Sequence, residues 1–333
     1  MTTSGDGQSM RYAQLGSYAG VSRLTLGGGG LGQVWGVSSV EEAVATVGAA
    51  LAAGINLIDT APMYGGCEAV IAEAFHGVLP AGVRITTKCQ LGEPRVGTVL
   101  TRLEESLDAS LEAMRLDHVD VYFLHSNICE DDTVYAHGND QRASFATPWS
   151  QYVEEVVPAF EDLKRRGRIG AWGITGVGVP STIIKALQHD VKPSVVQAIT
   201  NLLDSPGGIR RYSEAPRPRA VIAAANAHNV GVMGIRAVQA GALTAQFDRV
   251  VKASHPDAID YRRAAPFREL SAELGMDPAL LAHRYALDME GVDTVVLGVK
   301  NQTELAQCLQ AEAAGSLPSD LRAKIDGLRL TNA

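Results

Sequence analysis

The sequence predicts a protein of the α/β class, folded as a single (β/α)8 TIM barrel. Eight short apolar runs rich in Val, Ile and Leu alternate along the 333 residues with longer amphipathic segments, as buried parallel strands alternate with helices. No Gly/Ser-rich linker or break in composition divides the chain, so one closed barrel is favoured over a doubly wound open sheet. We expect one domain over residues 1–333, with residues 1–10 flexible.

The predicted strands are short and apolar, and a loop follows each of them. They comprise residues 24–27, 56–59, 84–88, 119–125, 170–174, 195–198, 231–235 and 294–298. Capping boxes predict two helix starts, at Ser39 with Glu42 and at Thr101 with Glu104. Glycines predict two helix ends, at Gly54 and Gly167.

Apolar residues at helical spacing predict the helix faces that pack on the barrel. These are Val40, Val44, Val47 and Leu51 in the first helix, Leu103, Leu107, Leu111 and Met114 in a later one, and Phe160 with Leu163 in a third. We assign them no chemistry.

Two segments exceed the minimal barrel. Residues 11–23 are expected to form a hairpin ahead of the first strand. Residues 126–148 form a long loop after the fourth strand, on the C-terminal face where barrel enzymes build their sites. This loop is either a lid or substrate wall, or a variable surface insertion.

Charge and cysteine content limit the partners and the compartment. Lys and Arg number 29 against 37 Asp and Glu, a net charge of −8, and the positive charges are scattered, which argues against nucleic-acid binding. The four cysteines have no C-x-x-C spacing, so neither a metal site nor a disulfide framework is indicated. With no secretory signal pattern and no apolar run of roughly 20 residues, we expect a cytoplasmic protein that acts on a small molecule away from membranes.

Four polar residues lie at the ends of neighbouring predicted strands or just after them, so they should converge. They are Asp59, Tyr64, Lys88 and His125. Asp59 and Lys88 emerge from apolar runs, where a charge is costly unless it is paired, so we expect them to pair. The ammonium group should lower the pKa of Tyr64 from about 10 and make it a proton donor or acceptor. A neutral His125 could hydrogen-bond a substrate oxygen.

Each of the four residues also has a structural interpretation. The Asp59–Lys88 pair could be a fixed internal ion pair, Tyr64 a loop anchor, and His125 a satisfied core histidine. Their convergence at adjacent strand ends favours chemistry over four independent structural roles.

The segments GINLIDTAPMYG at 54–65, ITTK at 85–88 and DVYFLH at 120–125 resemble the signature segments of the aldo-keto reductase superfamily. The resemblance extends over residues 16–308. It implies a (β/α)8 barrel that binds a nicotinamide cofactor without a Rossmann domain. It places the catalytic roles on Asp59, Tyr64, Lys88 and His125.

The cofactor segments resemble the family less regularly. Where most members have Gly-x-Ser-Asn, this chain has GITG at 173–176, which is similar to the L-galactose dehydrogenase branch and points to an aldose and NAD. The resemblance implies cofactor contacts at Gly29, Asp59, Thr175, Gln197, Ile235, Arg236, Val238, Gly241, Leu243, Gly298, Lys300, Asn301, Glu304 and Gln307. It implies substrate contacts at Trp35, Tyr64, His125 and Ser126.

Several of these assignments have alternatives. Arg236 is either a fork donor to the cofactor pyrophosphate or a solvated surface charge. Trp35 lines the substrate mouth or packs on the surface. The adenosine end of the cofactor is expected at residues 297–305, where a strand leads into a helix whose N-terminal amides can receive phosphate. Glu304 would repel a 2′-phosphate and favours NAD, whereas Lys300 argues for NADP.

These features predict an NAD(P)-dependent oxidoreductase that acts on a small carbonyl or hemiacetal, as an aldose 1-dehydrogenase using NAD and needing no metal. The alternative is an NADPH-dependent reductase of aldehydes or ketones. A non-catalytic barrel that binds nucleotide for regulation, and a Schiff-base aldolase with Lys88 as nucleophile, are less favoured.

Overall fold

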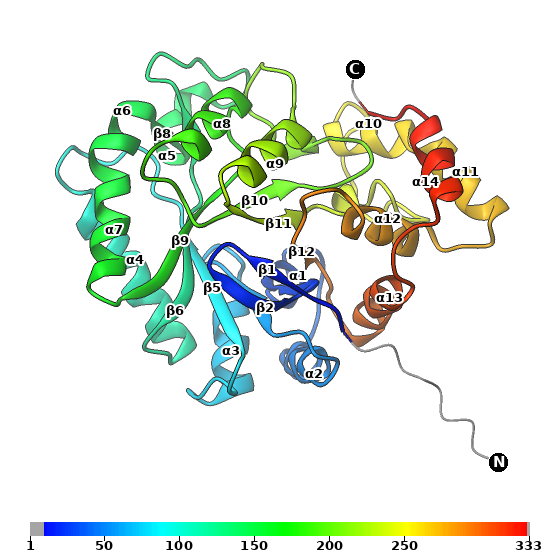
Figure 1. Ribbon diagram of the computed structural model, residues 1–333, viewed down its shortest axis with the longest axis horizontal. Coiled ribbons are helices and arrows are strands. Elements are labelled where there is room, and N and C mark those ends of the chain that lie inside the picture. The colour runs from blue at the N-terminus through cyan, green and yellow to red at the C-terminus, as the bar shows by residue number, and fades with distance from the viewer. Residues whose placement is uncertain (1–9, 332–333) are drawn as a thin grey trace.

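The computed structural model describes residues 10–331, and in it eight parallel strands close into a barrel (Figure 1). The strands are β3 (Leu24–Gly27), β4 (Leu57–Asp59), β5 (Arg84–Cys89), β6 (Val119–Leu124), β9 (Ile169–Thr175), β10 (Val195–Ile199), β11 (Gly231–Ile235) and β12 (Thr294–Leu297). Each predicted strand is confirmed to within one residue at either end. Apolar runs of this length are buried on both faces by the barrel interior and the surrounding helices.

Helices cover the outside of the barrel. The longer ones are α2 (Val40–Ala52), α3 (Cys67–Phe75), α4 (Val99–Met114), α7 (Val157–Arg165), α8 (Pro180–Gln188), α9 (Pro218–Ala227), α10 (Pro256–Arg263), α11 (Ala265–Glu273), α12 (Pro278–Leu287), α13 (Gln302–Ala313) and α14 (Ser319–Gly327). Short helical turns are α1 (Gly28–Leu31), η1 (Asn139–Gln141), α5 (Arg142–Phe145), α6 (Trp149–Gln151), η2 (Tyr152–Val156), η3 (Gly207–Ile209) and η4 (Gln239–Gly241).

The predicted N-terminal hairpin is confirmed as β1 (Tyr12–Leu15) and β2 (Tyr18–Ser22), which pair antiparallel. Leu15 and Val21 pack with apolar residues of the barrel interior, so the hairpin closes one end of the barrel. Of the segment expected to be flexible, residues 1–9 lie outside the described residues. Met10 is buried in the main core, so the expectation is wrong for that residue.

Two helix predictions need correction. The Oγ atom of Ser39 does cap α2 by accepting from the Glu42 amide at 3.1 Å, but the Glu42 carboxylate accepts from the Gln302 amide instead of closing the box. Thr101 lies inside α4, which begins at Val99 after Thr98, so the second capping box is wrong. The S/T-x-x-E pattern therefore indicates a helix start only where its first residue has a non-helical backbone, as Ser39 does.

The core-facing side of α2 agrees with the prediction in part. Val47 is buried, and Val44 and Leu51 are partly buried against the core, whereas Val40 is exposed. The rest of the buried face is made of Ala43, Thr46 and Ala50. Small side chains let this helix lie close to its neighbours. The faces predicted for the helices with Leu107 and Leu163 are buried as expected, and the helix ends at Gly54 and Gly167 are confirmed by positive φ angles of 92° and 71°.

The loop predicted at residues 126–148 has structure of its own. Its ends form a two-stranded parallel sheet, β7 (Asn127–Cys129) and β8 (Ala146–Pro148), with η1 and α5 between them. Phe145 packs edge to face on Tyr135 with ring centroids 4.9 Å apart and helps to fill a small core under this segment. We refer to residues 126–148 as the β7–β8 segment.

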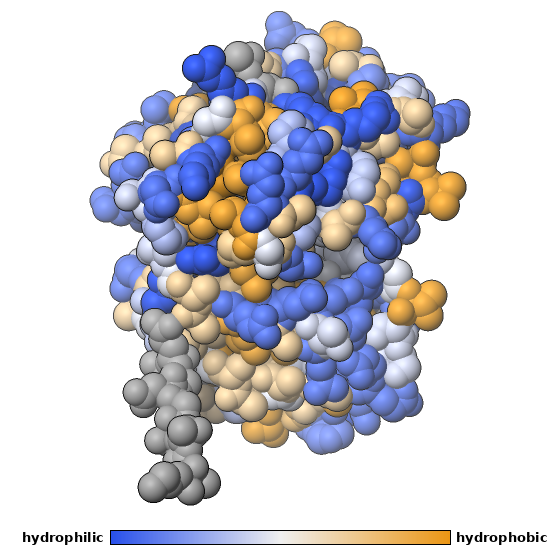
Figure 2. Space-filling model, turned by 90° about the vertical axis from the view of Figure 1, so that its right-hand side faces the viewer, coloured by the Kyte–Doolittle hydropathy of each residue, from blue (hydrophilic) through white to orange (hydrophobic). Residues whose placement is uncertain are grey.

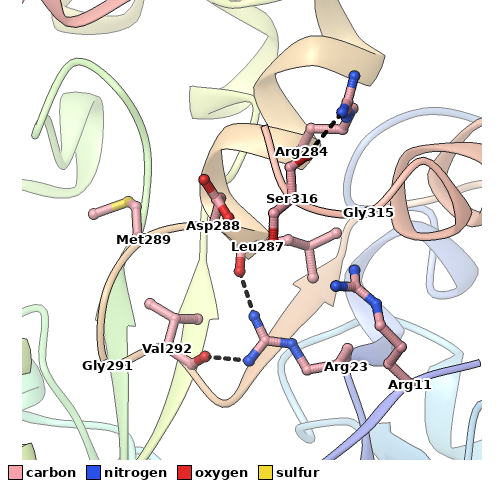
Figure 3. Close-up of a pocket in the computed structure, with 10 residues that line it drawn as sticks. All are labelled: Arg11, Arg23, Arg284, Leu287, Asp288, Met289, Gly291, Val292, Gly315 and Ser316. Carbon is pink, nitrogen blue, oxygen red and sulfur yellow. Dashed lines mark hydrogen bonds between the residues drawn. The ribbon is translucent and has the colours of Figure 1, made fainter. Parts of the chain in front are cut away.

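A small polar cavity of about 240 Å³ lies at the N-terminal ends of β3 and β12, beside Arg11, Arg23 and Arg284 (Figure 3). The Arg23 guanidinium donates to the backbone oxygens of Leu287 and Val292. Arg11 donates to Glu312 near the end of α13, and Arg284 to the oxygen of Ser316. These arginines satisfy carbonyl groups at chain turns and helix ends, so their role is structural.

Hydrophilic side chains predominate on the face that carries α11, α13 and α14, with smaller apolar patches between them (Figure 2). Among residues 10–331, no helix has the length and apolar character needed to cross a membrane. The four cysteines are buried and form no disulfide.

Candidate active site

The barrel brings together, at the C-terminal ends of its strands, the four sequence-predicted polar residues Asp59, Tyr64, Lys88 and His125, which we call the tetrad. Asp59 is the last residue of β4, Lys88 lies near the end of β5, and His125 directly follows β6. Tyr64 lies in the loop between β4 and α3. Since β4, β5 and β6 are neighbours in the barrel, the convergence follows from the order of the strands.

Lys88 and Asp59 form a fully buried ion pair. The Lys88 Nζ atom lies 2.7 Å from Asp59 Oδ2 and also donates to the Thr60 backbone oxygen at 2.8 Å. Burial alone would lower the pKa of Lys88, but Asp59 and Tyr64 raise it above its usual value. Lys88 therefore remains an ammonium group at neutral pH.

The other oxygen of Asp59 is held just as firmly. Asp59 Oδ1 accepts from Thr86 Oγ1 at 2.6 Å and from Gln197 Nε2 at 2.7 Å. Gln197 belongs to β10, so its amide ties the Asp59 carboxylate to a strand farther around the barrel. The sequence did not identify Thr86, because only the structure shows that its side chain points from β5 to the Asp59 carboxylate.

Tyr64 lies against this pair, with Lys88 Nζ 4.7 Å from the centroid of its ring. Burial raises the pKa of Tyr64, and Lys88 lowers it by less, so the pKa is above its usual value of 10. The expectation of a lowered pKa is therefore wrong, because desolvation of the phenolate outweighs the nearby charge. At neutral pH Tyr64 is a phenol that can donate a proton.

His125 faces Tyr64 with ring centroids 6.1 Å apart and the rings nearly perpendicular. Burial, aided by the charge of Lys88, lowers the pKa of His125 to about 3. The imidazole is neutral at physiological pH, as expected, and one ring nitrogen can donate a hydrogen bond. A substrate oxygen that reached both Tyr64 and His125 would meet two neutral donors.

Asp59, Tyr64 and His125 lie at one end of a cavity of about 900 Å³, within the range of small-molecule sites. The cavity extends to the start of α13. Fifteen of the predicted site residues line it, namely Gly29, Trp35, Asp59, Tyr64, His125, Thr175, Gln197, Ile235, Arg236, Val238, Gly241, Gly298, Lys300, Glu304 and Gln307.

Four predicted site residues lie behind the wall of the cavity. Lys88 acts on it through Asp59 and Tyr64, and Leu243 is fully buried in the core. Asn301 caps α13, with its side-chain oxygen accepting from the Glu304 amide at 2.9 Å. Ser126 is buried, and its Oγ accepts from the Gly92 amide at 2.7 Å.

Arg236 is not a solvated surface charge, because its side chain is only 11% exposed. Its guanidinium binds Asp257 Oδ1 at 3.0 Å and Gln239 Oε1 at 2.8 Å, and Arg249 binds the other oxygen of Asp257. This network holds the loop after β11 against the cavity. Sequence reasoning missed Asp257 and Arg249, which lie well beyond the strand end.

The start of α13 differs from the expected phosphate site. The Gln302 amide donates to Glu42 and the Glu304 amide to Asn301, so two of its first amides are already engaged. The Lys300 amide donates to Glu304 Oε2, and Lys300 Nζ lies 3.2 Å from Glu304 Oε1. The chain's own carboxylates therefore occupy the positive end of this helix.

The structure adds lining residues that sequence reasoning did not identify. Gln90, Asn127, Phe145, Arg211 and His283 all line the cavity. Gln90 and Asn127 each follow a predicted tetrad residue by two positions, which was the available signal. Phe145 ends the short helix α5 and Arg211 lies in the loop before α9, and the position of both is set by tertiary contacts.

The residues present fit an extended dinucleotide. The cavity is continuous from Tyr64 to Gln307, and Gly298 faces it where an added Cβ would meet only the Trp35 ring, at 3.6 Å. After β11 the backbone bends sharply, with positive φ at Ala240 and Gly241. The backbone can therefore approach a ligand closely at Gly298 and at Gly241, where no side chain intervenes.

The fold and the site define a (β/α)8-barrel enzyme with its active site at the C-terminal ends of the strands. A profile of the Aldo/keto reductase family matches residues 23–329, and the chain belongs to this family. It is accordingly an oxidoreductase that uses a nicotinamide cofactor, in a family that acts on small aldehyde or sugar substrates.

Individual relatives agree with this assignment. The chain is 26% identical to L-galactose dehydrogenase of Arabidopsis thaliana over 295 residues, 87% of this chain and 84% of the relative. It is 28% identical to NADH-specific methylglyoxal reductase of Escherichia coli over 167 residues, 45% of each chain. An aldo-keto reductase from Bacillus halodurans has the same fold, with a TM-score of 0.71, 22% identity and 96% of both chains covered.

Proposed function

We propose that the protein is an aldose 1-dehydrogenase that uses NAD. The observation that carries this proposal is a phenol, Tyr64, held against a buried ammonium group at one end of a cavity of about 900 Å³ that reaches the start of α13. The likeness to L-galactose dehydrogenase over most of both chains supports the choice of an aldose.

In oxidation, Tyr64 accepts the proton of the hydroxyl group at the anomeric carbon. Lys88 stabilises the phenolate, and Asp59 keeps Lys88 charged and fixed. His125 donates a hydrogen bond to the same oxygen as its charge changes. The bound nicotinamide supplies the redox chemistry by exchanging a hydride with carbon.

Residues along the rest of the cavity hold the cofactor. Gln197 and Thr175 lie beside the tetrad and would hold the nicotinamide end. An asparagine could not replace Gly176 without movement, because a Cβ there would lie 2.8 Å from the Gln197 oxygen. The packing around Gly176 therefore leaves no room for the asparagine that most family members have at this position.

The carboxylates at the start of α13 support NAD. Glu42 accepts a hydrogen bond from the Gln302 amide of the first turn. Glu304 accepts from the Lys300 amide just before the helix, and its carboxylate also pairs with the Lys300 ammonium group. A 2′-phosphate there would meet two negative groups and a cation that is already paired. The alternative, an NADPH-dependent reductase, requires Lys300 to leave Glu304.

The test is the absorbance at 340 nm with NAD or NADP and L-galactose, L-fucose or D-arabinose at mildly alkaline pH. Turnover of a sugar with NAD is the expected result. Turnover confined to aldehydes with NADPH would overturn the aldose and NAD assignments in favour of the reductase.

A further inference from the structure

Four lysine and arginine side chains line the cavity, and they differ in their partners. Arg236 and Arg249 bind Asp257, and Lys300 binds Glu304 and Asp248. The fourth, Arg211, forms no side-chain hydrogen bond or ion pair with any residue between 10 and 331. A half-buried guanidinium without an anion is costly, so its position calls for an explanation.

The position of Arg211 is fixed by the β7–β8 segment. Its guanidinium carbon lies 4.4 Å from the centroid of the Phe145 ring. Its backbone oxygen accepts from the His137 amide at 3.1 Å. Gly138 leaves room for the guanidinium, because a Cβ there would lie 2.7 Å from Arg211 Nη1.

The contact with the Phe145 ring places the cation beside an aromatic ring but uses none of its N–H donors in a hydrogen bond to an anion. This arrangement matches a carboxylate or a phosphate, which takes two parallel N–H donors. Among residues 10–331, no carboxylate takes these donors.

Arg211 lies toward the tetrad end of the cavity. Its aromatic support, Phe145, follows Ser144, whose backbone oxygen accepts from Gln90 Nε2 at 3.3 Å. Gln90 lies two residues beyond Lys88, and β8 pairs with β7, which starts two residues beyond His125. The wall that supports Arg211 is therefore continuous with the strands that carry the tetrad.

We propose that Arg211 binds an anionic group of the substrate, a carboxylate or a phosphate carried away from the reacting carbon. This inference rests on the proposed function. It narrows the substrates to sugars or aldehydes that carry an acidic or phosphate group. The segment that holds Arg211 is then a substrate wall, one of the two roles open to it from the sequence.

The test compares matched pairs of substrates in the wild type and in Arg211→Gln and Arg211→Lys. The pairs are D-galactose with D-galacturonate, D-glucose with D-glucose 6-phosphate, and butanal with succinic semialdehyde. In the wild type we expect kcat/KM to favour the anionic member of at least one pair. Arg211→Gln should lower that preference about 10-fold or more through KM, and Arg211→Lys should lower it less.

Arg210→Gln is the matched control. The Arg210 guanidinium donates to the backbone oxygens of Tyr212, Ser213 and Glu214, and it does not line the cavity. This variant should keep the wild-type preference. Loss of the preference in Arg210→Gln as well, or an unchanged preference in Arg211→Gln, would overturn the proposal while leaving the oxidoreductase function in place.

A binding measurement separates this proposal from failure of the proposed function. Calorimetric titration of the holoenzyme with succinate and with inorganic phosphate needs no turnover. Binding of either anion that weakens at least 10-fold in Arg211→Gln, but not in Arg210→Gln, supports the site even if every sugar is inert. Absence of binding by both anions, together with no anionic preference, would overturn it.

Discussion

The buried pair of Lys88 and Asp59 sets the charge of the residues around it. Lys88 stays protonated because Asp59 offsets the cost of its burial, and the same ammonium group helps to keep His125 neutral. Tyr64 keeps its proton because burial disfavours the phenolate. At neutral pH the site thus contains one cation, one anion and two neutral hydrogen-bond donors.

The ion pair should contribute more to stability than an exposed pair. Lys88→Met leaves the buried Asp59 without its cation and should lower the free energy of unfolding by about 3–5 kcal/mol. Lys185→Met breaks a half-exposed pair with Glu130 and should cost about 1 kcal/mol or less. Urea denaturation compares the two variants, and equal losses would contradict the account.

The pH dependence follows from the protonation states. In the proposed mechanism, oxidation needs the Tyr64 phenolate. Since burial raises the pKa of Tyr64, kcat/KM for oxidation should rise with pH through the alkaline range. His125, with a pKa of about 3, is already neutral at pH 5 and should add no step between pH 5 and 8. Initial rates from pH 5 to 10 test this, and a step near 6.5 that disappears in His125→Gln would refute it.

At the scale of elements, strand positions and tetrad order follow from the sequence because buried parallel strands need continuous apolar runs. Helix starts follow from the sequence less directly than strand positions do, because Thr101 and Glu104 have the spacing of a capping box although they lie within α4. The role of Phe145 could not be predicted, because the fold of the β7–β8 segment depends on contacts distant in sequence. The direction of the Tyr64 pKa shift depends on how deeply the ring is buried, which spacing does not reveal.

A pair of matched variants tests the corrected helix starts. Ser39→Ala removes the oxygen that accepts from the Glu42 amide and should lower the free energy of unfolding by about 1 kcal/mol. Thr101→Ala changes an exposed position inside α4 and should shift it by less than about 0.5 kcal/mol. Urea midpoints that moved more for Thr101→Ala than for Ser39→Ala would contradict this assignment.

At the scale of the whole molecule, the two ends of the barrel have different tasks. The hairpin and the arginines of the small polar cavity close and brace the N-terminal end. The C-terminal end holds a cavity that links the tetrad to the start of α13. In the proposed function, the choice between NAD and NADP is therefore made far from the reacting oxygen, by side chains of a different element.

Cofactor preference should therefore change without altering the tetrad. Glu304→Gln removes a carboxylate from the start of α13 and releases Lys300 from its partner. We expect kcat/KM with NADP to rise roughly 10-fold relative to NAD, in line with the loss of one charge-assisted contact and one repulsion. Steady-state rates with both cofactors measure this ratio. An unchanged ratio would show that Glu304 does not contribute to the preference for NAD.

In the proposed mechanism, the Tyr64 hydroxyl exchanges a proton with the reacting oxygen. The most direct test is turnover of Tyr64→Phe, followed at 340 nm, together with a fluorescence titration of cofactor binding. Since Phe keeps the ring against Lys88 but has no proton to exchange, kcat should fall by about 10²–10⁴-fold while cofactor affinity stays within a few-fold. Turnover within a few-fold of the wild type would contradict the assignment.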